Sequence, residues 1–288
     1  MSTDAKATPH DPHLRTDLLA LWRLQSPELI ADTHSSRLYR VRRADGSSAI
    51  LKQLKPEGHY ERAGFAYLAW REGHGTVRLL AQDDDACLLE DAGTQSLAAL
   101  HKAEGDAAAT PILCQLLPLL HAPSDRPFPQ DLTTLERHFR CLFELAEQDG
   151  PHREMANWAA AEARDLLNHQ TRQIPLHGDL HHDNVLKGAD GTWRVIDPHG
   201  LIGDPAYEVA NIFGNPGGPH LFAPERVAAL AEVFAPLLDC SPLRILRFAG
   251  VHAVVSIAWS LRPPQSPEAA ENIRERAAVA GFIRSLIA

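Results

Sequence analysis

The chain has 288 residues, of which 44% are hydrophobic and 23% charged, and it is long enough to bury a substantial core. Its formal net charge of -9, without a Lys/Arg cluster, argues against a nucleic-acid partner, because binding phosphate needs a basic face; we expect a neutral or cationic small molecule instead. No apolar run approaches the roughly 20 residues of a membrane span, so a membrane partner is not expected.

The N-terminus and the cysteines indicate where the protein resides. Residues 1–12 lack the basic start and apolar stretch of a secretory signal, so we expect a cytoplasmic protein. Separately, we expect a monomer or weak dimer. The four cysteines form no CxxC pair, which argues against a zinc knuckle or a disulfide framework; they are Cys87, Cys114, Cys141 and Cys240. We expect them to be buried as small apolar residues.

The first third of the chain carries strand patterns. Alternating apolar and polar residues predict strands at 37–43, 48–54, 77–81 and 87–90, and one helix at 60–71. Turn residues punctuate them, with Asp45-Gly46 between the first two strands. An antiparallel sheet with one helix is therefore predicted for this part.

Beyond Gly93 the pattern becomes helical. Helices are predicted at 111–121, 132–147, 152–170, 223–238, 243–261 and 267–286. One island interrupts them, where residues 184–187 and 193–196 flank an Asp190-Gly191 turn and predict a β-hairpin. The order predicts an α+β protein with a small sheet-rich lobe, residues 1–93, followed by a larger helical lobe, residues 94–288.

The densest polar cluster is the string from His177 to Asn184, directly before that hairpin. Its spacing matches the H-x-D-L-x-x-x-N catalytic loop of kinases, in which the Asp accepts a hydroxyl proton and the Asn holds magnesium. Asp179 is the predicted base and Asn184 a predicted Mg²⁺ ligand.

The second arm of the hairpin delivers Asp197, thirteen residues after Asn184. Phosphoryl transfer needs hard oxygen ligands that hold Mg²⁺ against the phosphates while another carboxylate orients the nucleophile. A single Asp in a turn is usually only a turn former, but independent turns have no reason to reproduce both spacings. We therefore predict an ATP-dependent phosphotransferase.

The segment Leu176–Asn184, with Ile196-Asp197-Pro198 and the phrase from Gly200 to Glu208, resembles the aminoglycoside phosphotransferase family, and within it the streptomycin 6-kinase and hydroxyurea phosphotransferase branch. The resemblance implies a protein-kinase-like fold and transfer of the ATP γ-phosphoryl group to a hydroxyl of an aminoglycoside-like acceptor. Streptomycin is the first expectation; hydroxyurea or another metabolite is the alternative.

The same resemblance implies a nucleotide site in the first lobe. Lys52 would meet the α- and β-phosphates, and Glu61 would hold the lysine in place, with Glu57 as an available substitute. Because a Gly-rich loop is absent, donors to phosphate would come from Ser35 and Ser36, which are also ordinary turn formers. The hinge would read the adenine edge through backbone groups near Glu90 and Ala92.

Several neighbouring residues have two interpretations. We expect His177 and Asp204 to support the loop structurally, and Tyr207 and Phe213 to lie in the core. His181, His182 and His199 could face either solvent or substrate, and Asp183 could bind substrate or cap a turn. Glu268 or Glu271 could meet a cationic acceptor, although a solvated helix face is the commoner explanation.

Two rival classes compete with a kinase. His177, His181, His182 and Asp183 could instead be transition-metal ligands of a hydrolase, which would leave Lys52 and the spacing to Asp197 unexplained. A pseudokinase that only binds nucleotide would usually have lost at least one of the residues expected to bind ATP and magnesium or to act as the base. All four are present, namely Lys52, Asp179, Asn184 and Asp197. A serine hydrolase is not indicated, because the chain has no G-x-S-x-G motif.

Overall fold

A computed structural model describes residues 11–218, 221, 223–262 and 266–287. They form two compact units, one made of the chain up to Gly58 with Leu80–Asp91, the other of His59–Leu79 with the chain from Ala92 onward. Residues 59–79 thus belong with the second unit, whereas the predicted lobes 1–93 and 94–288 remain a proposal. Most of the segment expected to lack a secretory signal lies outside the described residues.

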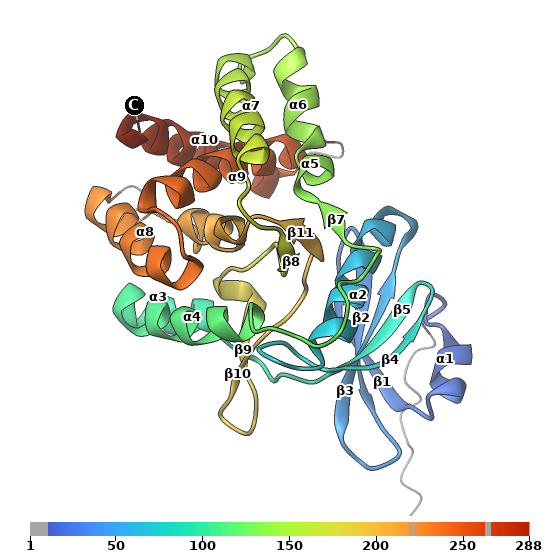
Figure 1. Ribbon diagram of the computed structural model, residues 1–288. Coiled ribbons are helices and arrows are strands. Elements are labelled where there is room, and N and C mark those ends of the chain that lie inside the picture. Colours follow the sequence, from blue (N-terminus) through green and yellow to red (C-terminus); the bar gives the residue numbers. More distant parts are fainter. Residues whose placement is uncertain (1–10, 219–220, 222, 263–265, 288) are drawn as a thin grey trace, which may run out of the picture. The chain divides into compact units, whose positions relative to one another are not determined.

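The first unit is built on a five-stranded sheet with the order β1-β2-β3-β5-β4 (Figure 1). Its strands are β1 (Gln25–Asp32), β2 (Ser36–Arg42), β3 (Ser48–Leu54), β4 (Leu79–Asp83) and β5 (Ala86–Glu90). The four predicted strands are confirmed to within two residues at each end. The sequence reading missed β1 and the helix α1 (Thr16–Leu21).

The apolar alternation of β3 explains the core of this unit. Leu51 pairs in register with Tyr39 on β2 and with Leu88 on β5, and all three are buried. Leu18 of α1 packs onto the same cluster. The sheet therefore buries one face beneath a short helix, as an antiparallel sheet with one apolar face must.

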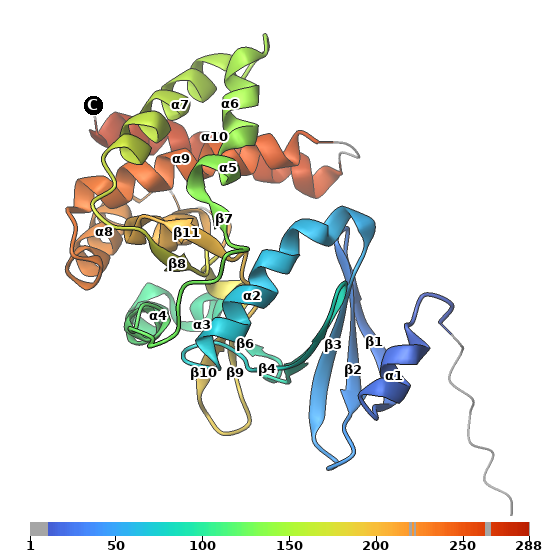
Figure 2. The ribbon, with the colours of Figure 1, turned by 45° about the vertical axis from the view of Figure 1, so that its right-hand side comes forward.

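The second unit is mainly helical. Its helices are α2 (Arg62–Arg71), α3 (Leu97–Glu104), α4 (Asp106–Leu120), α5 (Leu135–His138), α6 (Arg140–Glu147), α7 (Arg153–Asn168), α8 (Pro224–Leu238), α9 (Pro242–Ser260) and α10 (Pro267–Ile287), with the 3₁₀ segments η1 (Pro56–Glu61), η2 (His182–Asn184) and η3 (Pro205–Gly214) beginning near or within it. Figure 2 shows α9 and α10 side by side, and α6 and α7 pack against α9.

One predicted helix was wrong at its start. Residues 132–147 were expected to form a single helix, but they form β7 (Thr133–Thr134), then α5 and α6. Thr133 and Thr134 pair in parallel with β11 (Leu201–Gly203), and the Thr134 hydroxyl caps α5 by accepting from the Arg137 N–H. Threonine favours both roles over a helix interior, which explains the break.

The predicted hairpin is confirmed. β9 (Val185–Lys187) pairs with β10 (Trp193–Val195), and β6 (Gln95–Ser96) joins β9 on its other side. A second small sheet places β11 between β7 and β8 (Ile174–Leu176). The polar string from His177 to Asn184 therefore lies between two short strands in the sequence, after β8 and before β9.

Helix α9 corrects one expectation from the sequence. By length and composition alone it is long and apolar enough to cross a membrane, contrary to the prediction that no such run exists. In the structure 67% of that apolar window is buried, among the side chains of the second unit. Its apolar character is thus accounted for by its place in the core.

Candidate active site

His177, which is fully buried, supports the loop that follows β8. Its Nε2 lies 2.8 Å from the carbonyl oxygen of Ile196, and its Nδ1 accepts from the Asp179 N–H at 3.2 Å. Both ring nitrogens are therefore engaged with the backbone. The expected structural role of His177 agrees with these contacts.

Asp179 lies at the centre of a ring of donors. Asn184 Nδ2 donates to Oδ2 at 2.9 Å and Asn211 Nδ2 donates to Oδ1 at 2.8 Å. His181 Nε2 and His199 Nε2 lie 3.5 Å and 3.9 Å from Oδ2. Burial would raise the pKa of Asp179, but His199 and His181 outweigh it and hold the pKa far below its usual range. The carboxylate is thus kept ionised.

His181 carries the matching charge. Burial lowers its pKa, but the Asp179 carboxylate, with a smaller contribution from Asp183, raises the pKa to about 9. Its Nδ1 lies 3.6 Å from Asp183, whose side chain is largely exposed. At neutral pH, Asp179 and His181 therefore form an ion pair at the edge of the loop.

Glu208 supports the loop in a way that the sequence reading did not foresee. Its buried carboxylate accepts the backbone N–H groups of His177 at 3.0 Å and Gly178 at 2.9 Å, and lies 3.1 Å from His121 Nε2. Burial raises the pKa of Glu208, but the hydrogen bond from His121 leads the effects that lower it overall. Its position in the phrase from Gly200 to Glu208 was the available signal.

The hairpin brings Asn184 and Asp197 together. Val185 pairs with Val195, and the Ile196 N–H donates to the Asn184 carbonyl at 2.8 Å. Asp197 follows with φ of 59°, in the left-handed region that Asp tolerates better than most residues, and it is exposed. Asp197, which the sequence spacing paired with Asn184, thus directly follows Ile196, and Ile196 is hydrogen-bonded to Asn184.

These residues fit Mg²⁺ by their chemistry. The amide nitrogen of Asn184 is taken by Asp179, so its amide oxygen remains as the ligand atom, and Asp197 adds an exposed carboxylate. Oxygen ligands of this kind, a few from the protein with the rest from phosphate and water, are what Mg²⁺ prefers.

Asp204 anchors the next segment, as expected. It is buried, its Oδ1 accepts from the Ala206 N–H at 2.9 Å, and its Oδ2 accepts from Arg244 Nε at 2.9 Å. The carboxylate therefore starts η3 and ties it to α9, which fixes the segment that carries Glu208 and Asn211.

A cluster of aromatic side chains lies beside His199. The Tyr207 hydroxyl lies 2.8 Å from His138 Nε2 and 2.7 Å from His252 Nδ1, and burial lowers the pKa of both imidazoles, that of His252 to about 3. The Trp259 ring packs edge-on against His138 and His199. Tyr207 is a core residue, as predicted, as is the fully buried Phe213.

The predicted phosphate-side residues of the first unit lie on β3, at the start of β2 and in the turn between β1 and β2. Lys52 is only 6% exposed and pairs in register with Leu38 and Cys87. The Ser36 N–H is already bonded to Thr33 Oγ1 at 3.0 Å, and the Ser35 carbonyl accepts from the Lys55 N–H. Both serines therefore shape a tight turn, and their role as phosphate donors remains a prediction.

Three further nucleotide residues are placed individually. Glu61 is buried where η1 meets α2, Glu90 ends β5, and Ala92 is buried. Lys52 belongs to the first unit and Glu61 to the second, and their ion pair stays a prediction.

The ligand set proposed for a rival hydrolase is not assembled. Within the described part of the chain, one group of side chains has metal-ligand spacing, namely His101, Asp106 and His182, and it excludes His177, His181 and Asp183. Burial lowers the pKa of His182 to about 3, so its ring is neutral.

The remaining expectations concern surface groups and cysteines. Glu271 is exposed and lies 3.9 Å from Arg274, and Glu268 is exposed in the first turn of α10, which fits a solvated helix face. None of the four cysteines, all within the described residues, is in a disulfide; Cys87 and Cys141 are buried, and the other two are half-buried.

The sheet-and-helix architecture and the Asp179 loop define the class of small-molecule kinases with a protein-kinase-like fold. A solved aminoglycoside phosphotransferase, a thermostable mutant in complex with ADP and hygromycin B, is similar with a TM-score of 0.63 at 17% identity, over 94% of this chain and 97% of that one. At this identity the likeness concerns the fold.

Sequence relatives specify the family. Residues 21–263 match the family described as aminoglycoside/hydroxyurea antibiotic resistance kinase, and the chain belongs to it. A streptomycin 3''-kinase of Klebsiella pneumoniae is 38% identical over 83% of this chain and 89% of that protein. A streptomycin 6-kinase of Streptomyces glaucescens is 32% identical over 69% of this chain and 65% of that protein, which is under two thirds of its length.

Proposed function

We propose that the protein transfers the γ-phosphoryl group of ATP to a hydroxyl of streptomycin. The observation that carries the proposal is the ionised Asp179 carboxylate, held by two amides and two imidazoles next to a hairpin that presents oxygen ligands. Support for the acceptor comes from relatives named streptomycin kinases. The longer alignment with the 3''-kinase favours the 3''-hydroxyl, and the 6-hydroxyl is the second candidate.

The chain's own residues perform the proton transfer by position. Asp179 accepts the proton as the acceptor oxygen forms its bond to the γ-phosphorus, and ADP leaves with the electrons of the broken P–O bond. Asn211 and His181 keep the carboxylate oriented and ionised. Asn184 and Asp197 would hold Mg²⁺, which when bound neutralises charge on the phosphates.

The nucleotide side of the proposal rests on the first unit and the segment that follows it. Lys52 would neutralise the α- and β-phosphates, with Glu61 as its partner. Ser35 and Ser36 would border the phosphates, while backbone groups near Glu90 and Ala92 would read the adenine edge. The cytoplasmic location follows from the same need for ATP.

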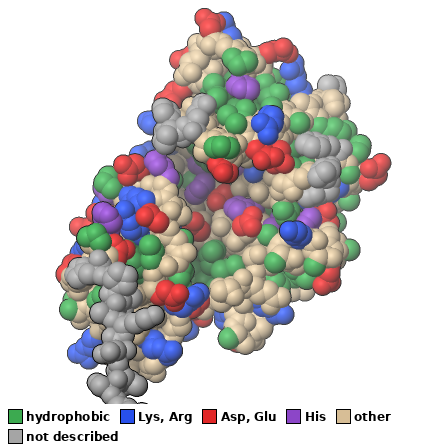
Figure 3. Space-filling model, turned by 180° about the vertical axis from the view of Figure 1, so that it is seen from behind, with side chains coloured by type: hydrophobic (Ala, Val, Ile, Leu, Met, Phe, Trp, Pro, Cys, Tyr) green, Lys and Arg blue, Asp and Glu red, His purple; other side chains and the backbone are tan. Residues whose placement is uncertain are grey.

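Surface charge agrees with a cationic acceptor better than with a polyanion. On the face shown in Figure 3, acidic side chains are interspersed among Lys and Arg side chains. This mixture favours neither sign of ligand, and it is the net charge of -9 that favours a cationic acceptor over a polyanion.

The test is ATP consumption with Mg²⁺ and streptomycin, hygromycin B, hydroxyurea or amino alcohols, followed by NMR of the product to locate the phosphate. We expect turnover with streptomycin and its loss in Asp179→Asn, while that variant still binds ATP. Equal turnover by Asp179→Asn would refute the assignment of the base. Turnover only with hydroxyurea would support the alternative acceptor, and ATP binding without any turnover would support a pseudokinase.

A further inference from the structure

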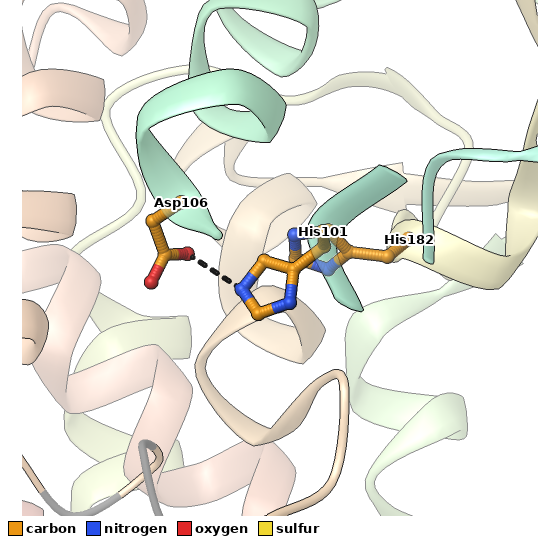
Figure 4. A group of neighbouring side chains, drawn as sticks. All are labelled: His101, Asp106 and His182. Carbon is orange, nitrogen blue, oxygen red and sulfur yellow. Dashed lines mark ion pairs between the residues drawn. The ribbon is translucent and has the colours of Figure 1, made fainter. Parts of the chain in front are cut away.

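Three metal-binding side chains from separate elements meet beside the catalytic loop. His101 comes from α3, Asp106 from the first turn of α4, and His182 from η2 (Figure 4). Their ligand atoms all lie within 4.8 Å of one another. The phosphotransfer chemistry described above uses none of the three.

His182 is the member that requires an explanation. Its side chain is 0% exposed, and neither ring nitrogen has a hydrogen-bond partner among the described residues. A buried polar atom without a hydrogen-bond partner is destabilising, so such atoms normally have a function or an additional ligand. The ring lies against His101, with centroids 5.0 Å apart (Figure 4).

The distances suit a small tetrahedral ion. His101 Nε2 lies 3.2 Å from Asp106 Oδ1. Zinc bonds of about 2.0–2.1 Å place neighbouring tetrahedral ligand atoms about 3.3 Å apart, so this edge already has the required length. No separation exceeds 4.8 Å, so the largest is at most about 1.5 Å above that value, which a torsional change of one side chain can close.

Arg226 supports the carboxylate from behind. Its Nε donates to Asp106 Oδ2 at 2.7 Å and its Nη2 to Oδ1 at 3.2 Å. A carboxylate accepts about four hydrogen bonds, so lone pairs remain for an ion. Outer hydrogen bonds of this kind orient a metal ligand. The Asp106 side chain is 31% exposed, which leaves a side open to solvent.

We propose that His101, Asp106 and His182 form a structural site for a zinc-class divalent transition metal, with water as the fourth ligand. Nitrogen ligands select zinc over magnesium, which prefers oxygen. The ion would join the α3–α4 turn to η2, the segment that ends at Asn184. It would therefore fasten the loop that carries Asp179 without taking part in phosphoryl transfer.

The test uses the full chain, stripped with EDTA and dialysed against Zn²⁺ in a buffer with excess Mg²⁺. We expect one zinc per chain by elemental analysis and a higher melting temperature than for the stripped protein. Co²⁺ in the unmutated protein should give the intense visible absorption of a tetrahedral site. Each of His182→Gln and Asp106→Asn should weaken zinc binding about 10-fold or more.

His169→Gln is the matched control, because exposed His169 lies 3.1 Å from Asp165 but no other described side chain supplies a second imidazole in a metal-ligand group with it. This variant should retain one zinc with unchanged affinity. Asp106→Asn, at a partly exposed position, keeps the test decisive if His182→Gln does not fold. Zinc well below one per chain in the unmutated protein, or equal affinity in Asp106→Asn, would overturn the proposal.

Discussion

Replacing Asp179 by Asn should lower the pKa of His181 markedly. The His181 ring lies 3.5 Å from the Asp179 carboxylate, and its pKa of about 9 exists because that charge outweighs burial. Without it, only the exposed carboxylate of Asp183 remains, and solvent screens that interaction. An opposite charge this close shifts a pKa by about 1–3, so we expect the pKa of His181 to fall to about 6–8 in the variant.

The same pair makes stability depend on pH. A folded-state pKa of about 9 against 6.5 in the unfolded chain corresponds to about 3 kcal/mol at 1.36 kcal/mol for each pKa unit. Because the folded pKa is raised, this stabilisation is complete below pH 6.5 and is lost as the pH rises to about 9. In Asp179→Asn the loss over this interval should largely vanish.

NMR of ring-labelled histidine measures the pKa directly, and the His181 signal is assigned by its disappearance in His181→Gln. Urea unfolding between pH 6 and 10 for the native protein, both single variants and the double variant isolates the pairwise energy. Titration of His181 near 6.5 in the native protein would refute the reasoning, as would a pairwise energy that does not change with pH.

Three more substitutions test the supports of the loop. Asn211→Leu removes the donor to Asp179, a charged hydrogen bond worth about 1.5–3 kcal/mol, so steady-state kinetics should show kcat about 10- to 100-fold lower with KM for ATP unchanged; unchanged kcat would contradict this. Glu208→Gln turns an amide toward two backbone N–H groups and should lower the free energy of unfolding by about 2–4 kcal/mol in urea titrations; an unaltered midpoint would count against it. Gly64→Ala places a Cβ over a backbone carbonyl and should cost about 2 kcal/mol or more, seen as a lower melting temperature, whereas Gly150→Ala, with open space around it, should not.

Much of the site could be predicted because its chemistry is local in the sequence. Asp179 and Asn184 share one loop, and the short hairpin to Asp197 fixes the distance between its arms. The strands of the first sheet were predictable for the same reason, since alternation and an Asp-Gly turn are signals within one segment.

Contacts between distant segments could not be predicted. Glu208 and Asn211 reach the loop from a 3₁₀ segment about 30 residues later, and no periodicity predicts which polar side chain of such a segment turns inward. His181 and His182 are adjacent, yet the His181 side chain faces Asp179 and the His182 side chain faces His101 on α3. Neighbouring identical residues can be told apart only by their surroundings.

The close packing of α2 against a later segment limits when this helix can reach its final position during synthesis. A side chain at Gly64 would overlap the Pro198 carbonyl, and one at Gly200 would overlap the Ala63 carbonyl, so two backbones touch. The later segment of this contact, Pro198 to Gly200, leaves the ribosome about 130 residues after the helix. The nascent helix must therefore wait for this backbone contact, and its cluster of Tyr67 and Trp70 with Leu132 lacks Ile202, until most of the chain is made. Chaperones that hold apolar segments should therefore affect the yield of folded protein more than its final stability.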